Sequence, residues 1–232
     1  MKRKITANWR SGIATAILGL GLGLGSAVQA SGFFSYAEHT PSYRTMNEAT
    51  RFYNNGDYLS ARARFRSAAR WADKTAQFNL AVTYYKGQGT ESDVAKAWAW
   101  FQLSAERGYP MMVDMADMLD GMINDDIRRR GQAILAELEP VYGDEVAIER
   151  TANHMRRERR RATGSRTGAT AFLRVVDSNG FSRDGRDFYR PEAWDFREVI
   201  AREAQLFDAR DRGVRVRAID TDEGESDQGN RD

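Results

Sequence analysis

The chain has 232 residues, of which 41% are hydrophobic and 11% aromatic, so one or two domains with a packed core are expected. Its 35 basic and 33 acidic residues give a net charge of +2. It contains no cysteine, which excludes disulfides, thiolate metal sites, cysteine catalysis and the lipid anchor of bacterial lipoproteins.

The first thirty residues have the pattern of an export signal. Residues 1–4 are basic, residues 13–27 are apolar, and residues 28–30 (Val-Gln-Ala) place small side chains where a signal peptidase cuts. We therefore predict a signal peptide at residues 1–30 and an exported protein, located in the periplasm or, as the alternative, secreted. Removal of this segment takes away four bases and no acid, leaving 31 bases against 33 acids. The basic balance of the precursor is therefore no sign of nucleic-acid binding.

A polar lead-in at residues 31–42 precedes a long region, residues 43–140, that is dominated by helix-forming side chains. Pro41, Pro110 and Pro140 fall at the borders of its periodic stretches, where a missing N–H costs least. The region is predicted to be almost entirely helical.

Two stretches of this region repeat each other. A shift of 36 residues superimposes five residues on identical ones: Asp57, Ala61, Ala63, Phe65 and Ala69 on Asp93, Ala97, Ala99, Phe101 and Ala105. A shift of 32 residues aligns Ala49, Phe52 and Tyr53 with Ala81, Tyr84 and Tyr85. Two helices per unit at such a period predict a helical solenoid, in which neighbouring units bury each other's apolar faces. The change of shift places a four-residue insertion between the paired helices, around Gly87 and Gly89.

The central copy resembles a Sel1-like repeat. The resemblance rests on residues 76–89 (AQFNLAVTYYKGQG), followed by Asp93, Lys96-Ala97, Trp100-Phe101, Ala105 and Gly108-Tyr109. The unit before it is more similar to a tetratricopeptide repeat, and the likeness extends over about residues 45–140. The resemblance implies a right-handed superhelix of antiparallel helix pairs that serves as a protein-binding scaffold in bacterial envelopes. On the family pattern, Tyr84 and Phe101 belong to the core, whereas Tyr85 and Lys86 are candidates for the concave, partner-binding face.

The chain changes character after Pro140. Residues 141–163 are predicted to form a basic helix, and residues 164–219 a small α+β extension. Within the extension, residues 172–176 and the region of Val214, Val216 and Ile219 suggest strands, and Pro191 suggests a helix start. Residues 220–232 hold acidic and small polar side chains and no apolar one, and are predicted to be a disordered acidic tail.

No motif in the sequence argues for catalysis, a cofactor or a metal. Of the two histidines, His39 lies in the lead-in, and His154 is expected to form a surface pair with Glu158. The main rival to a scaffold is a small enzyme or ligand-binding domain in residues 164–219. It would require convergence of several polar residues: Arg174, Asp177, Arg183, Asp187 and Tyr189. Alternatively, residues 164–219 only cap the open end of the solenoid.

Four methionines lie at helical spacing: Met111, Met115, Met118 and Met122. The principal interpretation is that this stripe belongs to the core. Two alternatives remain. Met115 and Met118 would contribute to an adaptable groove for a partner helix, or the thioethers would bind Cu(I).

The basic run at residues 156–161 offers further candidates for contact with a partner, Arg157 and Arg160. A solvated helix end is the simplest interpretation, because cations complement the helix dipole at a C-terminus. Peripheral contact with anionic lipid and pairing with the acidic residues of the tail are the alternatives. The acidic residues of the tail considered for this pairing are Asp220, Asp222, Glu223, Glu225 and Asp227.

The predicted signal peptide defines a new N-terminus. Cleavage after Ala30 should give an envelope-fraction protein whose N-terminal sequence begins at Ser31. A cytoplasmic protein that retains Met1 would contradict both the cleavage and the export.

Overall fold

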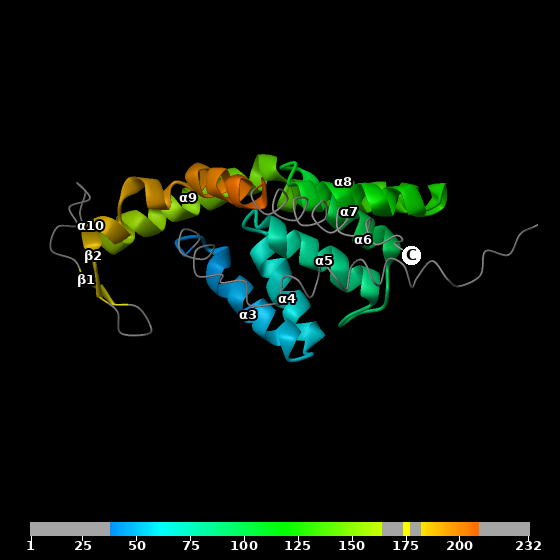
Figure 1. The fold of residues 1–232 in the computed structure, drawn as a ribbon, viewed down its shortest axis with the longest axis horizontal. Coiled ribbons are helices and arrows are strands. Elements are labelled where there is room, and N and C mark those ends of the chain that lie inside the picture. Colours follow the sequence, from blue (N-terminus) through cyan, green and yellow to red (C-terminus); the bar gives the residue numbers. More distant parts are fainter. Residues whose placement is uncertain (1–37, 164–173, 177–181, 209–232) are drawn as a thin grey trace, which may run out of the picture.

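The computed structural model describes residues 38–163, 174–176 and 182–208. These residues are mostly helical, and two short strands accompany the helices (Figure 1). The longer helices are α3 (Ser42–Asn54), α4 (Tyr58–Ala69), α5 (Lys74–Lys86), α6 (Val94–Ala105), α7 (Pro110–Met122), α8 (Asp125–Tyr142) and α9 (Asp144–Thr163). The predicted fold class, a mostly α helical solenoid with a small α+β extension, is confirmed. The predicted signal peptide and acidic tail lie outside the described residues.

Successive helices pack as stacked pairs. Helix α3 packs on α4 and α5 on α6, and the pairs are joined by contacts of α4 with α5 and of α6 with both α7 and α8. Because short loops connect these helices, neighbours in the chain run in opposite directions (Figure 1). Each pair therefore covers an apolar face of the next, as the repeat predicts.

Local side chains fix where the repeat helices begin. The carboxylates of Asp57, Asp73 and Asp93 each accept a hydrogen bond from the backbone N–H three residues later, at 2.9–3.1 Å. These are N-caps, which satisfy donors that a helix start leaves free. The four-residue insertion forms the loop before Asp93. Its Gly89 has a φ of +69°, and a Cβ there would lie 2.6 Å from the backbone of Tyr58, so the loop requires glycine.

The small and aromatic residues of the repeat form the core as predicted. Ala61 and Ala97 have no exposed surface, and Tyr84 and Phe101 are buried. The ring of Phe101 meets that of Phe78 edge to face, with centroids 5.2 Å apart. Close approach of backbones at the alanines is what allows these rings to fill the space between the helices.

The methionine stripe differs from the prediction. The buried residues of α7 are Met112, Met115, Ala116 and Leu119. Met111 and Met118 are only partly buried against the core, and Met122 is 41% exposed. The assignment of the whole stripe to the core is therefore wrong for Met122. Met112 and Leu119 complete the apolar face at i, i+3, i+4 and i+7, which rotates the buried side away from Met111 and Met122.

Two proline assignments also need correction. Pro140 lies inside α8, which continues to Tyr142, and not at a helix border. The N–H that it lacks would donate to the carbonyl of Ala136, a residue on the exposed side of α8. Pro191 opens a short 3₁₀ helix, Pro191–Trp194, and the following helix, residues 196–208, starts after a break at Asp195. The Asp195 carboxylate accepts a hydrogen bond from the N–H of Arg197 at 2.9 Å.

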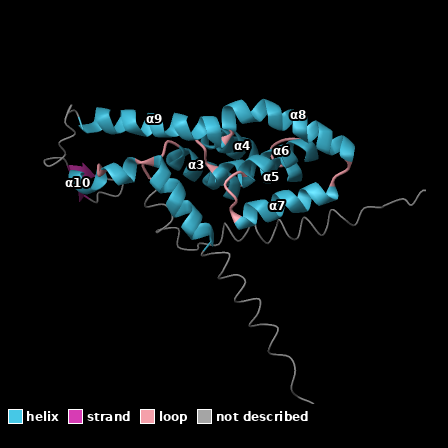
Figure 2. Ribbon diagram, turned by 90° about the horizontal axis from the view of Figure 1, so that it is seen from above, coloured by secondary structure: helices cyan, strands magenta, loops and turns pink. Residues whose placement is uncertain are grey.

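The C-terminal elements return along α9. Helices α8 and α9 follow one another along one side of the molecule (Figure 2). Strand β1 (Arg174–Val176) pairs antiparallel with β2 (Ser182–Asp184), and helix α10 (Gly185–Phe188) follows. The predicted strand at residues 172–176 is thus found, but its partner is β2; the strand predicted around residues 214–219 lies outside the described residues. Phe196 and Val199 then pack with Ala147 and Met155 of α9 in a second small core.

The helix pairing predicts the effect of overpacking. Ala97→Trp should destabilise the protein by at least about 1–3 kcal/mol, because a side chain with no exposed surface is enlarged within a packed core. For a chain of this size the melting temperature should fall by several degrees. Ala133→Trp on the exposed side of α8 is the matched control, and equal melting of the two variants would refute the proposed helix contacts.

Candidate interaction surfaces

The polar residues that a site in the extension would need do not converge. Val175 pairs with Arg183 across the hairpin, so Arg174 and Arg183 point to opposite faces. The Arg174 Nε donates to Ser182 at 3.0 Å, whereas Arg183 forms an ion pair with Glu38 at 2.7 Å. Asp187 is exposed. The fifth residue, Asp177, lies outside the described residues.

Tyr189 takes part in an aromatic cluster that ties the lead-in to the extension. Its ring stacks on Trp194, which in turn stacks on His39 with centroids 4.8 Å apart. Burial, with the charges of Arg183 and Arg190, lowers the pKa of His39 to about 4. The imidazole is therefore neutral at pH 7 and acts as an aromatic packing group.

The second histidine also differs from expectation. His154 is partly buried and packs on the ring of Trp71, with centroids 4.8 Å apart. No ion pair joins it to Glu158 among the described residues, so the predicted surface pair is not formed. In the described part of the chain, no group of three or more His, Asp or Glu is placed to hold a metal ion. No described helix is long and apolar enough to cross a membrane.

Tyr85 and Lys86 lie side by side at the end of α5, and both are partly exposed. The carbonyl of Tyr85 accepts a hydrogen bond from Ser92 at 2.8 Å, which fixes the loop that follows. Partial burial lowers the pKa of Lys86. The neighbouring indoles of Trp98 and Trp100, in contrast, are buried in the core, so they do not line a ligand groove.

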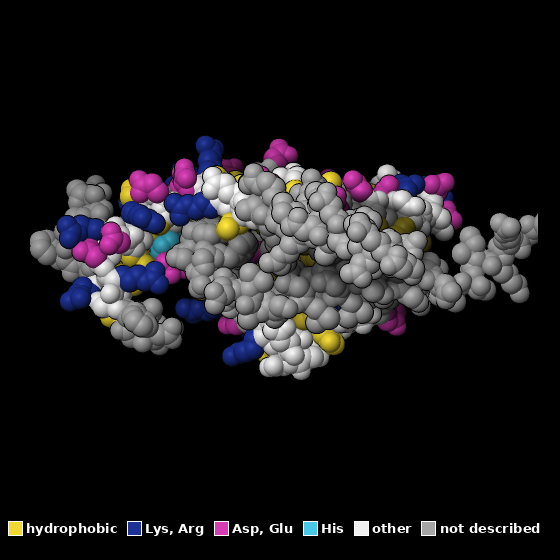
Figure 3. Space-filling view, viewed as in Figure 1, with side chains coloured by type: hydrophobic (Ala, Val, Ile, Leu, Met, Phe, Trp, Pro, Cys, Tyr) yellow, Lys and Arg dark blue, Asp and Glu magenta, His cyan; other side chains and the backbone are white. Residues whose placement is uncertain are grey.

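The other predicted contact residues divide into buried and exposed ones. Met115 is buried and is not available to a partner, whereas Met118 is half-buried at the edge of α7. Arg157 and Arg160 are exposed near the end of α9. At that end of the molecule, basic and acidic side chains alternate over the surface (Figure 3).

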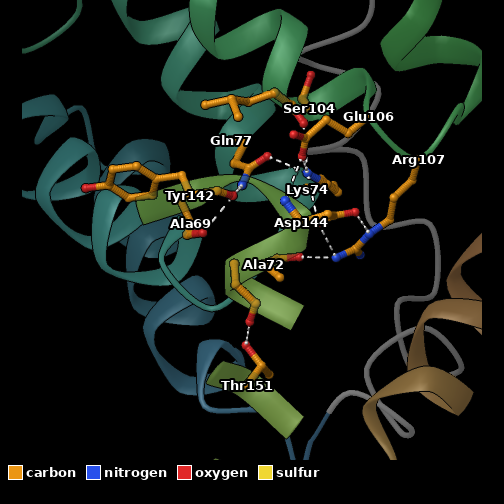
Figure 4. Close-up of polar contacts among 12 residues, drawn as sticks. Ala69, Ala72, Lys74, Gln77, Ser104, Glu106, Arg107, Tyr142, Asp144 and Thr151 are labelled. Atoms are coloured by element: carbon orange, nitrogen blue, oxygen red, sulfur yellow. Dashed lines mark hydrogen bonds and ion pairs between the residues drawn. The ribbon is translucent and has the colours of Figure 1, made fainter. Parts of the chain in front are cut away.

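The most unusual polar feature is a buried lysine that the sequence pattern did not single out. Lys74, the first residue of α5, has only 1% of its side chain exposed. Its amine donates to the Leu103 carbonyl at 2.8 Å and to Gln77 at 3.1 Å, and it forms ion pairs with Glu106 and, at 3.0 Å, with Asp144 (Figure 4). Burial lowers the pKa of Lys74, against the opposing charges of the two carboxylates.

Arg107 joins the same network. Its guanidinium binds both carboxylate oxygens of Asp144, at 2.8 and 3.0 Å, and donates to the Ala72 carbonyl at 2.8 Å (Figure 4). Burial opposes the charge of Asp144, but the hydrogen bond and charge of Arg107, with those of Lys74, hold its pKa below the usual value. The Asp144 carboxylate therefore bridges two cations from different helix ends.

The network extends to the C-terminal helix through Glu203. This carboxylate lies 3.0 Å from Arg107 and accepts a hydrogen bond from the Tyr109 hydroxyl at 3.2 Å. The Tyr109 ring also stacks on Phe207, with centroids 4.5 Å apart. Burial raises the pKa of Glu203 to about 7, although Arg107 works in the opposite direction.

These contacts give the network a structural role, because it connects α5, the end of α6, α9 and the C-terminal helix. The buried lysine amine already has four acceptors, which leaves it no role as a free base or nucleophile. The sequence did contain a local signal. A lysine in the first turn of a helix interacts unfavourably with the helix dipole, so its presence there indicates a compensating interaction elsewhere. Its partners could not be identified in that way, because Asp144 and Glu203 come from distant parts of the chain.

Stacked antiparallel helix pairs with alanine contacts define a helical-repeat protein. The family model described as the Sel1 repeat matches residues 74–109, from the first residue of α5 to the residue before α7. The chain therefore contains a Sel1-like repeat, as the sequence resemblance predicts.

No curated protein matches the chain. Among solved structures, it is similar to a protective antigen present in uropathogenic Escherichia coli strains that displays an SLR fold, with a TM-score of 0.43 and 19% identity. That match covers 52% of this chain and 26% of the antigen.

The raised pKa of Glu203 predicts a pH dependence of stability. Because its pKa rises from 4.5 to about 7 on folding, the folded state holds the proton more tightly, and stability falls as pH rises through this range. Glu203→Gln should remove this loss. The difference in free energy of unfolding between wild type and variant should therefore change by roughly 1–3 kcal/mol between pH 5 and pH 8. Urea unfolding at the two values measures it, and parallel curves would show that Glu203 titrates normally.

Proposed function

We propose that this protein is a scaffold of the bacterial envelope that binds another protein through its helical repeats and has no catalytic activity of its own. The observation that carries the proposal is the Sel1 repeat at residues 74–109. Solenoid repeats stack into extended surfaces, and such surfaces serve to bind other chains. The signal pattern at residues 1–30 supports a periplasmic location, with secretion as the alternative.

The arrangement of polar groups supports a binding role over an enzymatic one. The buried charges of Lys74, Arg107 and Asp144 are used within the fold, and the polar residues of the extension do not meet. What the repeat offers to a partner is the partly exposed surface at the end of α5, formed by Tyr85 and Lys86. A tyrosine beside a lysine suits a protein partner, because it combines a large apolar contact area with a charge at its edge.

No observation on the described residues favours the alternatives. A Cu(I) site would need the thioethers of the stripe to meet, but Met115 is in the core and Met122 points to solvent. Contact with anionic lipid would use the exposed Arg157 and Arg160, and basic and acidic side chains are mixed over this end of the molecule (Figure 3).

A pair of single substitutions tests the proposed surface. A photo-crosslinking residue at position 86 should capture a partner in intact cells, whereas the same residue at Gln132, exposed on α8, should not. With the partner purified, Lys86→Ala should weaken binding about tenfold in titration calorimetry and leave the melting temperature unchanged. Arg129→Ala, which removes an exposed cation elsewhere, should do neither. Equal adducts at both positions, or equal affinity of both variants, would rule out this surface.

A further inference from the structure

Helix α4 carries a row of arginines on one face. Arg62, Arg66 and Arg70 follow each other at intervals of four residues, the last at the residue that ends the helix. Side chains at this spacing lie on the same side of a helix. We call these three residues the arginine stripe.

In the part of the chain that the structure describes, no carboxylate forms an ion pair with the arginine stripe. Arg66 donates to the Tyr142 hydroxyl at 3.2 Å, and Arg62 lies over the ring of Tyr84, 5.7 Å from its centroid. The Nε of Arg62 is buried without a hydrogen-bond partner. On the opposite face of the same helix, Arg64 does pair with a carboxylate, that of Glu48, at 3.2 Å.

A further arginine lies beside the arginine stripe and adds to its charge. Lys96 also sits over the Tyr84 ring, 5.7 Å from the centroid, but its amine pairs with Asp93 at 3.3 Å. Arg150 donates to the backbone carbonyl of Arg70 at 2.7 Å. Burial, with the charge of Arg70, lowers the pKa of Arg150, which shows that two cations are held close together here. The surface therefore has positive charge in excess.

The basic run at the end of α9 is less available. Arg161 pairs with Glu158 at 3.1 Å, Arg159 donates to the Tyr189 carbonyl at 3.0 Å, and Arg156 donates to Asn153 at 2.7 Å. These local contacts engage three of the five arginines in the run. An acidic segment therefore gains more from the arginine stripe than from residues 156–161.

We propose that the chain's own acidic tail, residues 220–232, binds the arginine stripe in an extended conformation. Glu223, Glu225 and Asp227 alternate with small residues, Gly224 and Ser226. In an extended chain, alternate residues share a side and lie about 6.6 Å apart. Arginines four residues apart on a helix are separated by about 6 Å along its axis. The three acids therefore match the three arginines in register as well as in charge.

Contacts near Phe207 give the direction of binding. Phe207 stacks on Tyr109, and the nearby Arg107 binds the carbonyl of Ala72, two residues after Arg70. The chain therefore leaves the described structure near the Arg70 end of the arginine stripe. The residues between Phe207 and Glu223 span up to about 50 Å when extended, far more than the length of α4. Glu223 then lies nearest Arg70 and Asp227 nearest Arg62.

Binding in cis has a consequence for other ligands. A tethered segment acts at an effective concentration in the millimolar range for short flexible linkers. An acidic segment of another protein would have to displace the tail before it reached α4. The tail would thus compete with weakly bound acidic chains for this surface.

The absence of cysteine allows a direct test by disulfide trapping in the full chain. Leu59→Cys places a thiol one turn before Arg62 on the same face of α4, where the native side chain is 62% exposed. Gly229→Cys places the second thiol two residues after Asp227, on the side of the extended tail that carries the three acids. Under mild oxidation this pair should form an intramolecular bridge at least about five times faster than the matched pair Ala133→Cys with Gly229→Cys, whose helix position lies on α8. In 1 M salt, where the Debye length is about 3 Å, the advantage should disappear.

A charge exchange tests the proposed register in the same assay. Arg66→Glu should slow the bridge several-fold, and Arg66→Glu combined with Glu225→Arg should restore it. Arg64→Glu, on the opposite face of α4, should leave the rate unchanged. Melting curves of the reduced variants confirm that each is folded. Equal rates for the two cysteine pairs, no effect of salt, or faster bridging of Gly229→Cys to Asn153→Cys beside the basic run would overturn the proposal.

Discussion

A buried ammonium group governs the arrangement of this molecule. Taking the amine of Lys74 out of water costs several kcal/mol unless opposite charges and hydrogen bonds surround it. Asp144, Glu106, Gln77 and the Leu103 carbonyl supply that environment. Gln77 lies in α5 with Lys74, whereas Leu103 and Glu106 come from the end of α6 and Asp144 from the start of α9. The three chain segments must therefore meet at one point.

The direction of α9 and of the C-terminal helix follows from this network of ion pairs. Asp144 occupies the first turn of α9, where a carboxylate is favourable to the helix dipole, and it binds Lys74 and Arg107 together. Arg107 in turn binds Glu203, which lies 96 residues later in the sequence. The repeat, α9 and the C-terminal helix are thus connected through a single guanidinium group. The unusual backbone of Ala72, with a φ of +60°, lies at the same place, where its carbonyl receives the guanidinium of Arg107.

Buried and exposed cations have different partners in this molecule. The buried ones are matched by carboxylates, since an unpaired charge in the interior would be strongly destabilising. Among the described residues, the arginine stripe of α4 contacts the hydroxyls of Tyr84 and Tyr142 and the ring of Tyr84, and it forms no ion pair with a carboxylate. Exposed cations without carboxylates cost the fold little, so their presence in register on one face suits recognition more than stability. Tyr85 and Lys86, both partly exposed, lie at the end of α5. The surface that they form and the arginine stripe therefore lie on separate helices.

The sequence alone determined the features that depend on local chemistry. Alanine and aromatic spacing gave the helix pairs and their core, with Ala97, Tyr84 and Phe101 in the predicted roles. Gly89 and Asp93 marked the loop and the cap, because a glycine requirement and an N-cap act within a few residues. The strand at residues 174–176 was also visible in its β-branched composition.

Tertiary structure decided whatever depends on distant partners. Packing of Met112 and Leu119 against the rest of the core decided which side of α7 is buried. The spacing of the four methionines alone could not show which side of the helix would face the core. His39 has no local signature as an aromatic packing group, because Trp194 reaches it from the far end of the chain. The same holds for Lys74, Arg107 and Glu203, whose ion pairs join residues many turns apart. Periodicity records which residues share a face, but it carries no information about which distant charge will lie opposite them once the chain has folded.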